Sequence, residues 1–135
     1  MTPGFVRPVV LVVDDDRDTL DMYALFLEFS GIQVLTAATV DAAFALAIAH
    51  APDVVITDLL VQGAATGADL CRQLHEDQRT ANIPAILMTG SSRQADAQAA
   101  MAAGCAEVRI KPYLPDALVS DIRTILARSS ARVAQ

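Results

Sequence analysis

The chain has 135 residues, a length that suits one globular domain with a buried core. Apolar residues form 53% of it and charged residues 19%, and no apolar run is long enough to cross a bilayer, so we expect a soluble protein. The net charge of -6 argues against direct contact with nucleic acid, because clustered Lys and Arg provide most of that affinity. The N-terminus lacks the pattern of a secretory signal, and a cytoplasmic location follows by default.

Short apolar runs alternate with segments of helical period along the chain. The expected strands are about Val9–Val13, Gln33–Ala37, Val54–Thr57, Ala85–Met88 and Val108–Ile110. The expected helices are about Arg17–Phe29, Val40–His50, one that ends near His75, Ser92–Ala103, and Pro115–Arg128. This order is typical of parallel strands joined by crossover helices. The sequence therefore predicts an α/β fold with a doubly wound, five-stranded parallel sheet and helices on both faces.

Residue types at the ends of these elements predict their boundaries. Asp16 is expected to cap the first helix, because its carboxylate can accept a free amide of the first turn. Ser91, with Gln94 three residues on, resembles a capping box for the fourth helix. We expect a core of about residues 8–128, preceded by a short flexible segment and followed by a frayed tail at residues 129–135.

Polar residues gather at the carboxyl ends of the expected strands. Asp14 and Asp15 follow the first strand, Asp58 the third, Thr89 the fourth and Lys111 the fifth. In open parallel sheets, ligands bind beyond the carboxyl ends of the strands. We therefore expect these residues to form one site.

Carboxylates in such a site suit a magnesium ion. Mg2+ prefers oxygen ligands, keeps several waters and is usually held by one or two carboxylates together with a substrate phosphate. Asp15 and Asp58 can supply the carboxylates, while Asp14 can hold a bound water or orient its neighbour. The backbone carbonyl of Leu60 is a further candidate ligand.

A carboxylate can also be the nucleophile in phosphoryl transfer when cationic groups neutralise the charge on the transferring oxygens. Asp58 is the best candidate, because it stands alone at the end of a central strand. Lys111 would pair with one phosphoryl oxygen, and the Thr89 hydroxyl would donate a hydrogen bond to another. A cis peptide bond before Pro112 would aim the lysine ammonium into the site.

Four motifs together resemble the receiver domains of two-component response regulators, over about residues 9–126. The motifs are Val12-Val13-Asp14-Asp15-Asp16, Asp58, Thr89-Gly90 and Lys111-Pro112-Tyr113. The resemblance implies a flavodoxin-like sheet with strand order 2-1-3-4-5. It also implies that residues 1–135 form a single receiver domain with no output domain, which acts by binding something else.

Roles for individual residues follow from the same resemblance. Asp58 would accept a phosphoryl group from the phosphohistidine of a sensor histidine kinase or phosphotransfer protein, and Thr89 and Lys111 would sense it. The implied magnesium ligands are Asp14, Asp15, Asp58 and the Leu60 carbonyl. Such a protein is a phosphorylation-dependent switch and not an enzyme beyond assisting its own phosphotransfer and dephosphorylation. The cognate kinase, the downstream target and dimerisation stay open.

The sequence departs from the family pattern in the loop after Asp58, which lacks the usual proline, and at two single positions. Val108 stands where the family commonly has Tyr or Phe, so a rotating aromatic switch is absent and the signal leaves by another route. Leu60 lies two residues past Asp58, where an apolar side chain cannot orient an attacking water. We therefore expect a comparatively long-lived phosphoaspartate.

Two other classes of function remain as alternatives. Dehalogenase-like phosphatases also use a strand-end Asp, a Thr or Ser, a Lys and Mg2+, but Asp18 stands where their first motif wants Thr or Val. A structural interaction module with incidental phosphorylation is the other. Cys71 and Cys105 have no metal-ligand spacing, and we expect two isolated, buried and reduced thiols.

Overall fold

The computed structural model describes residues 7–61 and 63–134. The strands in these ranges are β1 (Val9–Val13), β2 (Gln33–Ala37), β3 (Val54–Asp58), β4 (Ala85–Thr89) and β5 (Glu107–Ile110). The helices are α1 (Arg17–Phe29), α2 (Val40–His50), α3 (Gly67–Glu76), α4 (Gln94–Ala102) and α5 (Pro115–Ala134). The flexible N-terminal segment expected before the core lies, apart from Arg7, outside the described residues.

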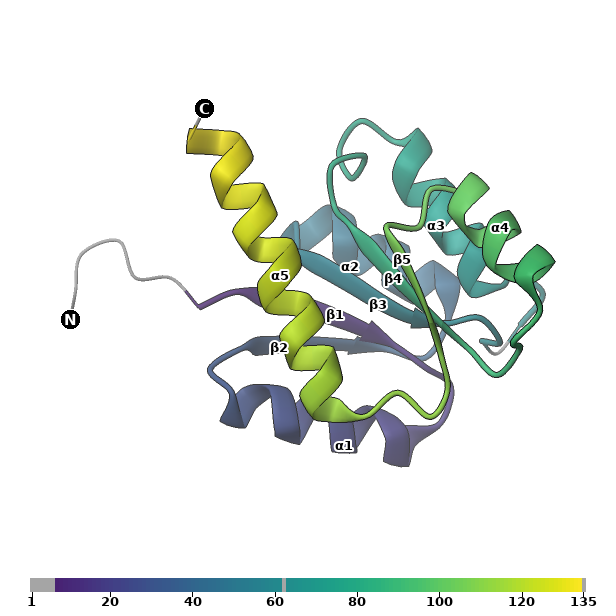
Figure 1. Ribbon diagram of the computed structural model, residues 1–135, viewed down its shortest axis with the longest axis horizontal. Helices are drawn as coiled ribbons and strands as arrows, with labels where there is room; N and C mark the ends of the chain where they lie inside the picture. The colour runs from purple at the N-terminus through teal and green to yellow at the C-terminus, as the bar shows by residue number, and fades with distance from the viewer. Residues whose placement is uncertain (1–6, 62, 135) are drawn as a thin grey trace.

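The five strands form one parallel sheet in the order β2-β1-β3-β4-β5, so the predicted fold class and strand order are confirmed. Helices α1 and α5 cover one face of this sheet, and α2, α3 and α4 cover the other (Figure 1). None of the described helices is both long and apolar enough to span a bilayer.

Each face of the sheet buries its own apolar cluster, because neighbouring residues of a strand point to opposite faces. Val10 and Val12 of β1 pack with Leu118 and Ile122 of α5, and all four side chains are fully buried. Leu11, between the two valines, packs on the opposite face with residues of α2 and α3. The three-layer core therefore follows from strands that are apolar on both sides, as buried parallel strands are.

Two predicted helix caps are wrong in detail. Asp16 does occupy the N-cap position of α1, but its carboxylate accepts a hydrogen bond from the Thr19 hydroxyl and caps no backbone amide. Helix α4 begins at Gln94, with Arg93 as N-cap, two residues later than expected. Ser91 forms no capping box, because its hydroxyl donates to Asp96.

The C-terminal helix is longer than the sequence analysis predicts. Its start at Pro115 is as expected, but the helix continues to Ala134, so the prediction of a frayed tail is wrong for residues 129–134. The polar composition of this segment favours exposure, yet a helix that is already nucleated extends at little cost through residues such as Ala and Arg.

An ion pair joins α5 to the edge strand of the sheet. Arg109 Nε lies 2.8 Å from Asp121 Oδ2, and the Tyr113 hydroxyl donates to the same carboxylate. The hydrogen bond from Arg109 holds the pKa of Asp121 below its usual range. Arg109 interrupts the apolar strand because it pairs with α5 of the same chain.

The first prediction concerns the α5 side of the core. Leu118 is fully buried and Leu114, one turn earlier, is 61% exposed. Leu118→Ala should lower the free energy of unfolding by about 2–5 kcal/mol, because it removes apolar contacts and leaves a cavity. Leu114→Ala should change it by less than about 0.5 kcal/mol. Urea unfolding of both variants measures the difference, and equal losses would contradict this packing.

Candidate functional site

The carboxyl ends of the central strands bring two aspartates together. Val13 of β1 pairs with Thr57 of β3, so the residues that follow, Asp14 and Asp58, lie side by side at the same edge of the sheet. Both are buried, with 2% and 8% of their surface exposed. Two neighbouring buried carboxylates repel each other, so the ionised form of both is unfavourable unless a cation compensates their charge.

Lys111 provides one positive charge at this edge. Its ammonium Nζ lies 2.8 Å from Asp58 Oδ2, across the end of the intervening strand β4. Burial lowers the pKa of Lys111, but the hydrogen bond and the charge of Asp58 more than offset this and leave the pKa raised. The ammonium therefore stays protonated at neutral pH. Asp58 Oδ1 accepts no hydrogen bond from the described residues, which leaves one carboxylate oxygen for other chemistry.

Thr89 lies beside this ion pair, at the end of β4. Its side chain is buried, and its hydroxyl oxygen accepts a hydrogen bond of 3.1 Å from the Ser91 amide. Within the described part of the chain the hydroxyl donates to no acceptor, so its proton remains for a ligand. A surface hollow joins the three side chains and is lined by Asp58, Leu59, Leu60, Thr89, Gly90, Ser91 and Lys111.

Asp14 is held in place and carries an unfavourable charge. One oxygen, Oδ1, accepts a hydrogen bond of 2.9 Å from the amide of Asp16. Burial raises the pKa of Asp14, and the nearby charge of Asp58 raises it further, while the Asp16 amide and Lys111 lower it. The edge thus holds more buried negative charge than Lys111 alone neutralises.

The remaining candidate ligands lie at the margin of this cluster. Asp15 is exposed and lines a different hollow, beside Arg17 and Thr36. Leu60 is also exposed, at 72%, and borders the hollow at Asp58. Among the residues the structure describes, no three His, Cys, Asp or Glu side chains already surround a metal-sized space. The donors nevertheless fit a hard cation, because they are carboxylate and carbonyl oxygens with an excess of negative charge.

Gly67 fixes the loop that follows Asp58. Its amide donates to the Leu59 carbonyl over 2.8 Å, and a Cβ atom on this glycine would lie 2.1 Å from the carbonyl oxygen of Asp58. Thr66 and Asp69 form a reciprocal capping box that starts α3 at this point. Its Thr-x-x-Asp spacing is the sequence signal from which this box could have been predicted.

Tyr23 is a further residue that the sequence analysis missed. Its hydroxyl donates a buried hydrogen bond of 2.7 Å to the carbonyl of Tyr113, two residues after Lys111. Burial raises the pKa of Tyr23. The peptide bond between Lys111 and Pro112 is cis. Helix α1 therefore anchors the loop that carries the lysine, and the only signal for Tyr23 was its place on the apolar face of that helix.

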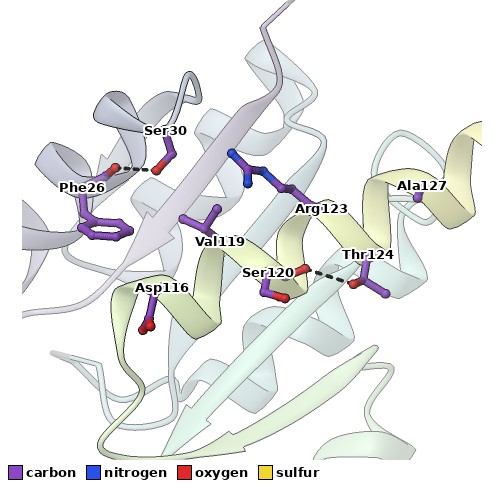
Figure 2. Close-up of a pocket in the computed structure, with 8 residues that line it drawn as sticks. All are labelled: Phe26, Ser30, Asp116, Val119, Ser120, Arg123, Thr124 and Ala127. Atoms are coloured by element: carbon purple, nitrogen blue, oxygen red, sulfur yellow. Dashed lines mark hydrogen bonds between the residues drawn. The ribbon is translucent and has the colours of Figure 1, made fainter.

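A second groove lies away from these residues, between the end of α1 and α5. Figure 2 shows its lining: Phe26, Ser30, Asp116, Val119, Ser120, Arg123, Thr124 and Ala127. The Ser30 and Thr124 hydroxyls donate to backbone carbonyls one turn earlier on their own helices. Those hydroxyl protons are already used within the helices, and the groove contains none of the strand-end residues.

A family model and curated proteins match this chain over most of its length. The family model described as the response regulator receiver domain matches residues 10–123. Among curated proteins, the chain is 29% identical to the phosphate regulon transcriptional regulatory protein PhoB of Pseudomonas aeruginosa, over 92% of this chain and 54% of that protein. It is 30% identical to the DNA-binding response regulator MtrA of Mycobacterium tuberculosis, over 96% of this chain and 55% of that protein. The chain thus spans about half the length of the curated relatives it matches.

Solved structures agree with the fold over their whole length. A response regulator receiver domain protein from Clostridium thermocellum is 28% identical with a TM-score of 0.83, covering 92% of this chain and 98% of that one. The chemotaxis response regulator CheY4 of Vibrio cholerae is 25% identical with a TM-score of 0.82, covering 89% and 99%.

The close approach at Gly67 gives the second prediction. Gly67→Ala should destabilise the protein by about 1–3 kcal/mol, because the new methyl group collides with the Asp58 carbonyl. Gly90→Ala is the matched control, since its Cβ would meet open space, and should cost less than about 0.5 kcal/mol. Thermal unfolding of the two variants compares them, and a tolerated Gly67→Ala would contradict the geometry.

The third prediction follows from the raised pKa of Asp14. The penalty of ionising this buried group is absent below its ordinary pKa of 3.8 and complete above its folded value. Asp14→Asn should therefore raise the free energy of unfolding at pH 7 by roughly 0.5–2 kcal/mol and leave it nearly unchanged near pH 3.

Urea unfolding across this pH range measures the effect of Asp14→Asn. The exposed neighbour Asp15 supplies the control, because Asp15→Asn alters an exposed side chain and should change the free energy of unfolding by less than about 0.5 kcal/mol. A gain from Asp14→Asn that is equal at both ends of the range would contradict the assignment.

Proposed function

The chain belongs to the response regulator receiver domain family, and we propose that it takes a phosphoryl group from a sensor kinase phosphohistidine onto Asp58. The observation that carries this proposal is the contact of 2.8 Å between Lys111 Nζ and Asp58 Oδ2, beside the hollow that Thr89 borders. A buried carboxylate can act as a nucleophile when one of its oxygens is hydrogen-bonded to a fixed ammonium and the other accepts no hydrogen bond.

The transfer uses this chain's own groups in distinct ways. A carboxylate oxygen of Asp58 forms a bond to phosphorus as the bond from phosphorus to the histidine nitrogen breaks, and the imidazole leaves. Lys111 offsets charge on the phosphoryl oxygens, and the Thr89 hydroxyl donates its proton to one of them. Each group lies at the end of a strand, so the sheet holds it in position before the donor arrives.

Magnesium is the cofactor that the donor set fits best. We assign its ligands to the carboxylates of Asp14, Asp15 and Asp58 and the backbone carbonyl of Leu60. The bound cation supplies positive charge that Lys111 alone does not provide. The burial of Asp14 beside Asp58 supports this assignment, because a bound cation would compensate the charge of two adjacent carboxylates.

Phosphorylation would then change the affinity of this chain for a partner protein. Apolar side chains are exposed on the surface of α4, β5 and the start of α5: Met101 at 51%, Ile110 at 53% and Leu114 at 61%. Val108 is half-buried against the core on the α3 side, so no aromatic ring turns there. The change would reach this surface through the backbone, since Lys111 directly follows Ile110.

The fourth prediction tests the phosphoacceptor. Acetyl phosphate with Mg2+ should add the mass of one phosphoryl group to the full chain, measured by intact-protein mass spectrometry, and Asp58→Asn should abolish the gain. Asp53→Asn is the control at the opposite end of the same strand, where the residue accepts a hydrogen bond from Val9, and should retain it. Phosphorylation that persists in Asp58→Asn would refute the assignment. A phosphorylated chain with unchanged oligomeric state and partner affinity would instead indicate an interaction module.

The fifth prediction concerns the lifetime of the phosphoaspartate. Leu60→Asn should speed the loss of phosphate about fivefold to tenfold. The reason is that the Asn amide would form one hydrogen bond with the attacking water, and the free energy of one such bond corresponds to this change in rate. Leu60→Ala separates the added amide from the lost apolar group and should change the rate less. Loss of phosphate is followed by intact mass over time, and an unchanged or slower rate in Leu60→Asn would count against this role.

A further inference from the structure

Cys71 and Cys105 lie in contact, although they are 34 positions apart in the sequence. Their sulfur atoms are 2.7 Å apart, and both side chains are buried, at 1% and 4% exposure. They are the only two cysteines of the chain. The expectation of two isolated thiols was therefore wrong about their isolation, although both are indeed buried and free.

The backbone around the pair fixes this approach from two directions. Cys71 lies on α3, and Cys105 follows α4 at the turn into β5, where its amide donates to the Ala100 carbonyl over 3.2 Å. Gly104 has a left-handed φ of +108°, and a Cβ there would lie 2.9 Å from His75 on α3. This turn therefore packs tightly against the helix that carries Cys71.

We propose that Cys71 and Cys105 form a redox-sensitive pair, which a low-molecular-weight disulfide such as oxidised glutathione converts reversibly to an intramolecular disulfide. A disulfide bond is about 2.0 Å long, so the two sulfurs need to approach by less than about 1 Å. Neither residue belongs to the strand-end site, so the proposal does not depend on the function proposed for Asp58.

The exchange proceeds in two balanced steps. One of the two cysteines loses its proton, and its thiolate attacks one sulfur of the oxidised reagent, which forms a mixed disulfide and releases one thiolate. The other cysteine then loses its proton and attacks the sulfur of the first, which releases the second thiolate. The reagent gains two electrons and the protein loses two hydrogens.

Access to the buried pair requires a local opening, and α4 is the element best suited to open. Of its nine residues only Ala100 is buried, and that residue belongs to the same apolar cluster as both cysteines. A helix with so little buried surface opens more readily than the core strands. The resulting disulfide would tether α3 to the turn that leads into β5 and Lys111.

Incubation of the full chain with oxidised glutathione tests the proposal by intact-protein mass spectrometry. The expected product is a monomer lighter by two hydrogen atoms, which no longer reacts with a maleimide in urea and regains both thiols after reduction. Its melting temperature should rise by several degrees, since the bond closes a long loop of the unfolded chain. Glutathione adducts without this loss of mass, disulfide-linked dimers alone, or oxidation only in urea would each overturn the proposal.

Variants test the mixed-disulfide step and the opening. Cys71→Ala and Cys105→Ala should each accumulate a glutathione adduct at the remaining cysteine, because no second thiol displaces it, and failure of both variants to accumulate an adduct would refute this step. Ala99 is an exposed interior residue of α4, and Ala99→Gly should speed oxidation about fivefold by favouring opening of the helix. An unchanged rate in Ala99→Gly would contradict entry through α4.

Discussion

The ion pair between Lys111 and Asp58 joins two strands that are not neighbours in the sheet. Lys111 follows β5 and Asp58 ends β3, so the ammonium reaches across the end of β4, and Thr89 lines the same hollow. This contact requires fixed positions for the loop after Asp58 and the loop that carries Lys111. Gly67 allows the loop after Asp58 to fold back against the strand, and Tyr23 holds the carbonyl of Tyr113. The site therefore depends on helix contacts from both faces of the sheet.

The same edge carries an imbalance of charge that connects structure with function. Asp14 and Asp58 are buried side by side, and one ammonium offsets only part of their charge. A fold selected for stability alone would replace such a group, because burying an unpaired carboxylate is unfavourable. Under the proposed function, a bound cation and a transferred phosphoryl group would together change this balance and alter the surface around β5 and α5.

Much of the fold was predictable, because strong local signals agree with it. The apolar runs predicted all five strands, and the strand-end position of Asp14, Asp58, Thr89 and Lys111 predicted which side chains would meet. The strand order came from the resemblance and not from the runs, since every strand is apolar on both faces and local patterns do not specify neighbours. The extension of α5 was not predicted, because a polar composition does not distinguish an exposed helix from a frayed tail.

What the sequence did not reveal depends on contacts between distant residues. Nothing near Cys71 indicates that Cys105 lies against it, and nothing near Tyr23 indicates its bond to the Tyr113 carbonyl. The position of Asp15 also differs from the expected one. Its exposed side chain borders a different hollow from the one at Asp58. Side-chain direction on a loop is set by the surroundings and not by position in the sequence.

Calorimetric titration with Mg2+ tests the central claim most directly, because it asks whether the strand-end cluster lacks positive charge. The account predicts saturable binding of one Mg2+ per chain, which is lost in Asp58→Asn and enhanced or retained when the competing ammonium is removed in Lys111→Met. The account would be contradicted if the parent chain showed no saturable binding, or if Asp58→Asn bound Mg2+ as well as the parent does.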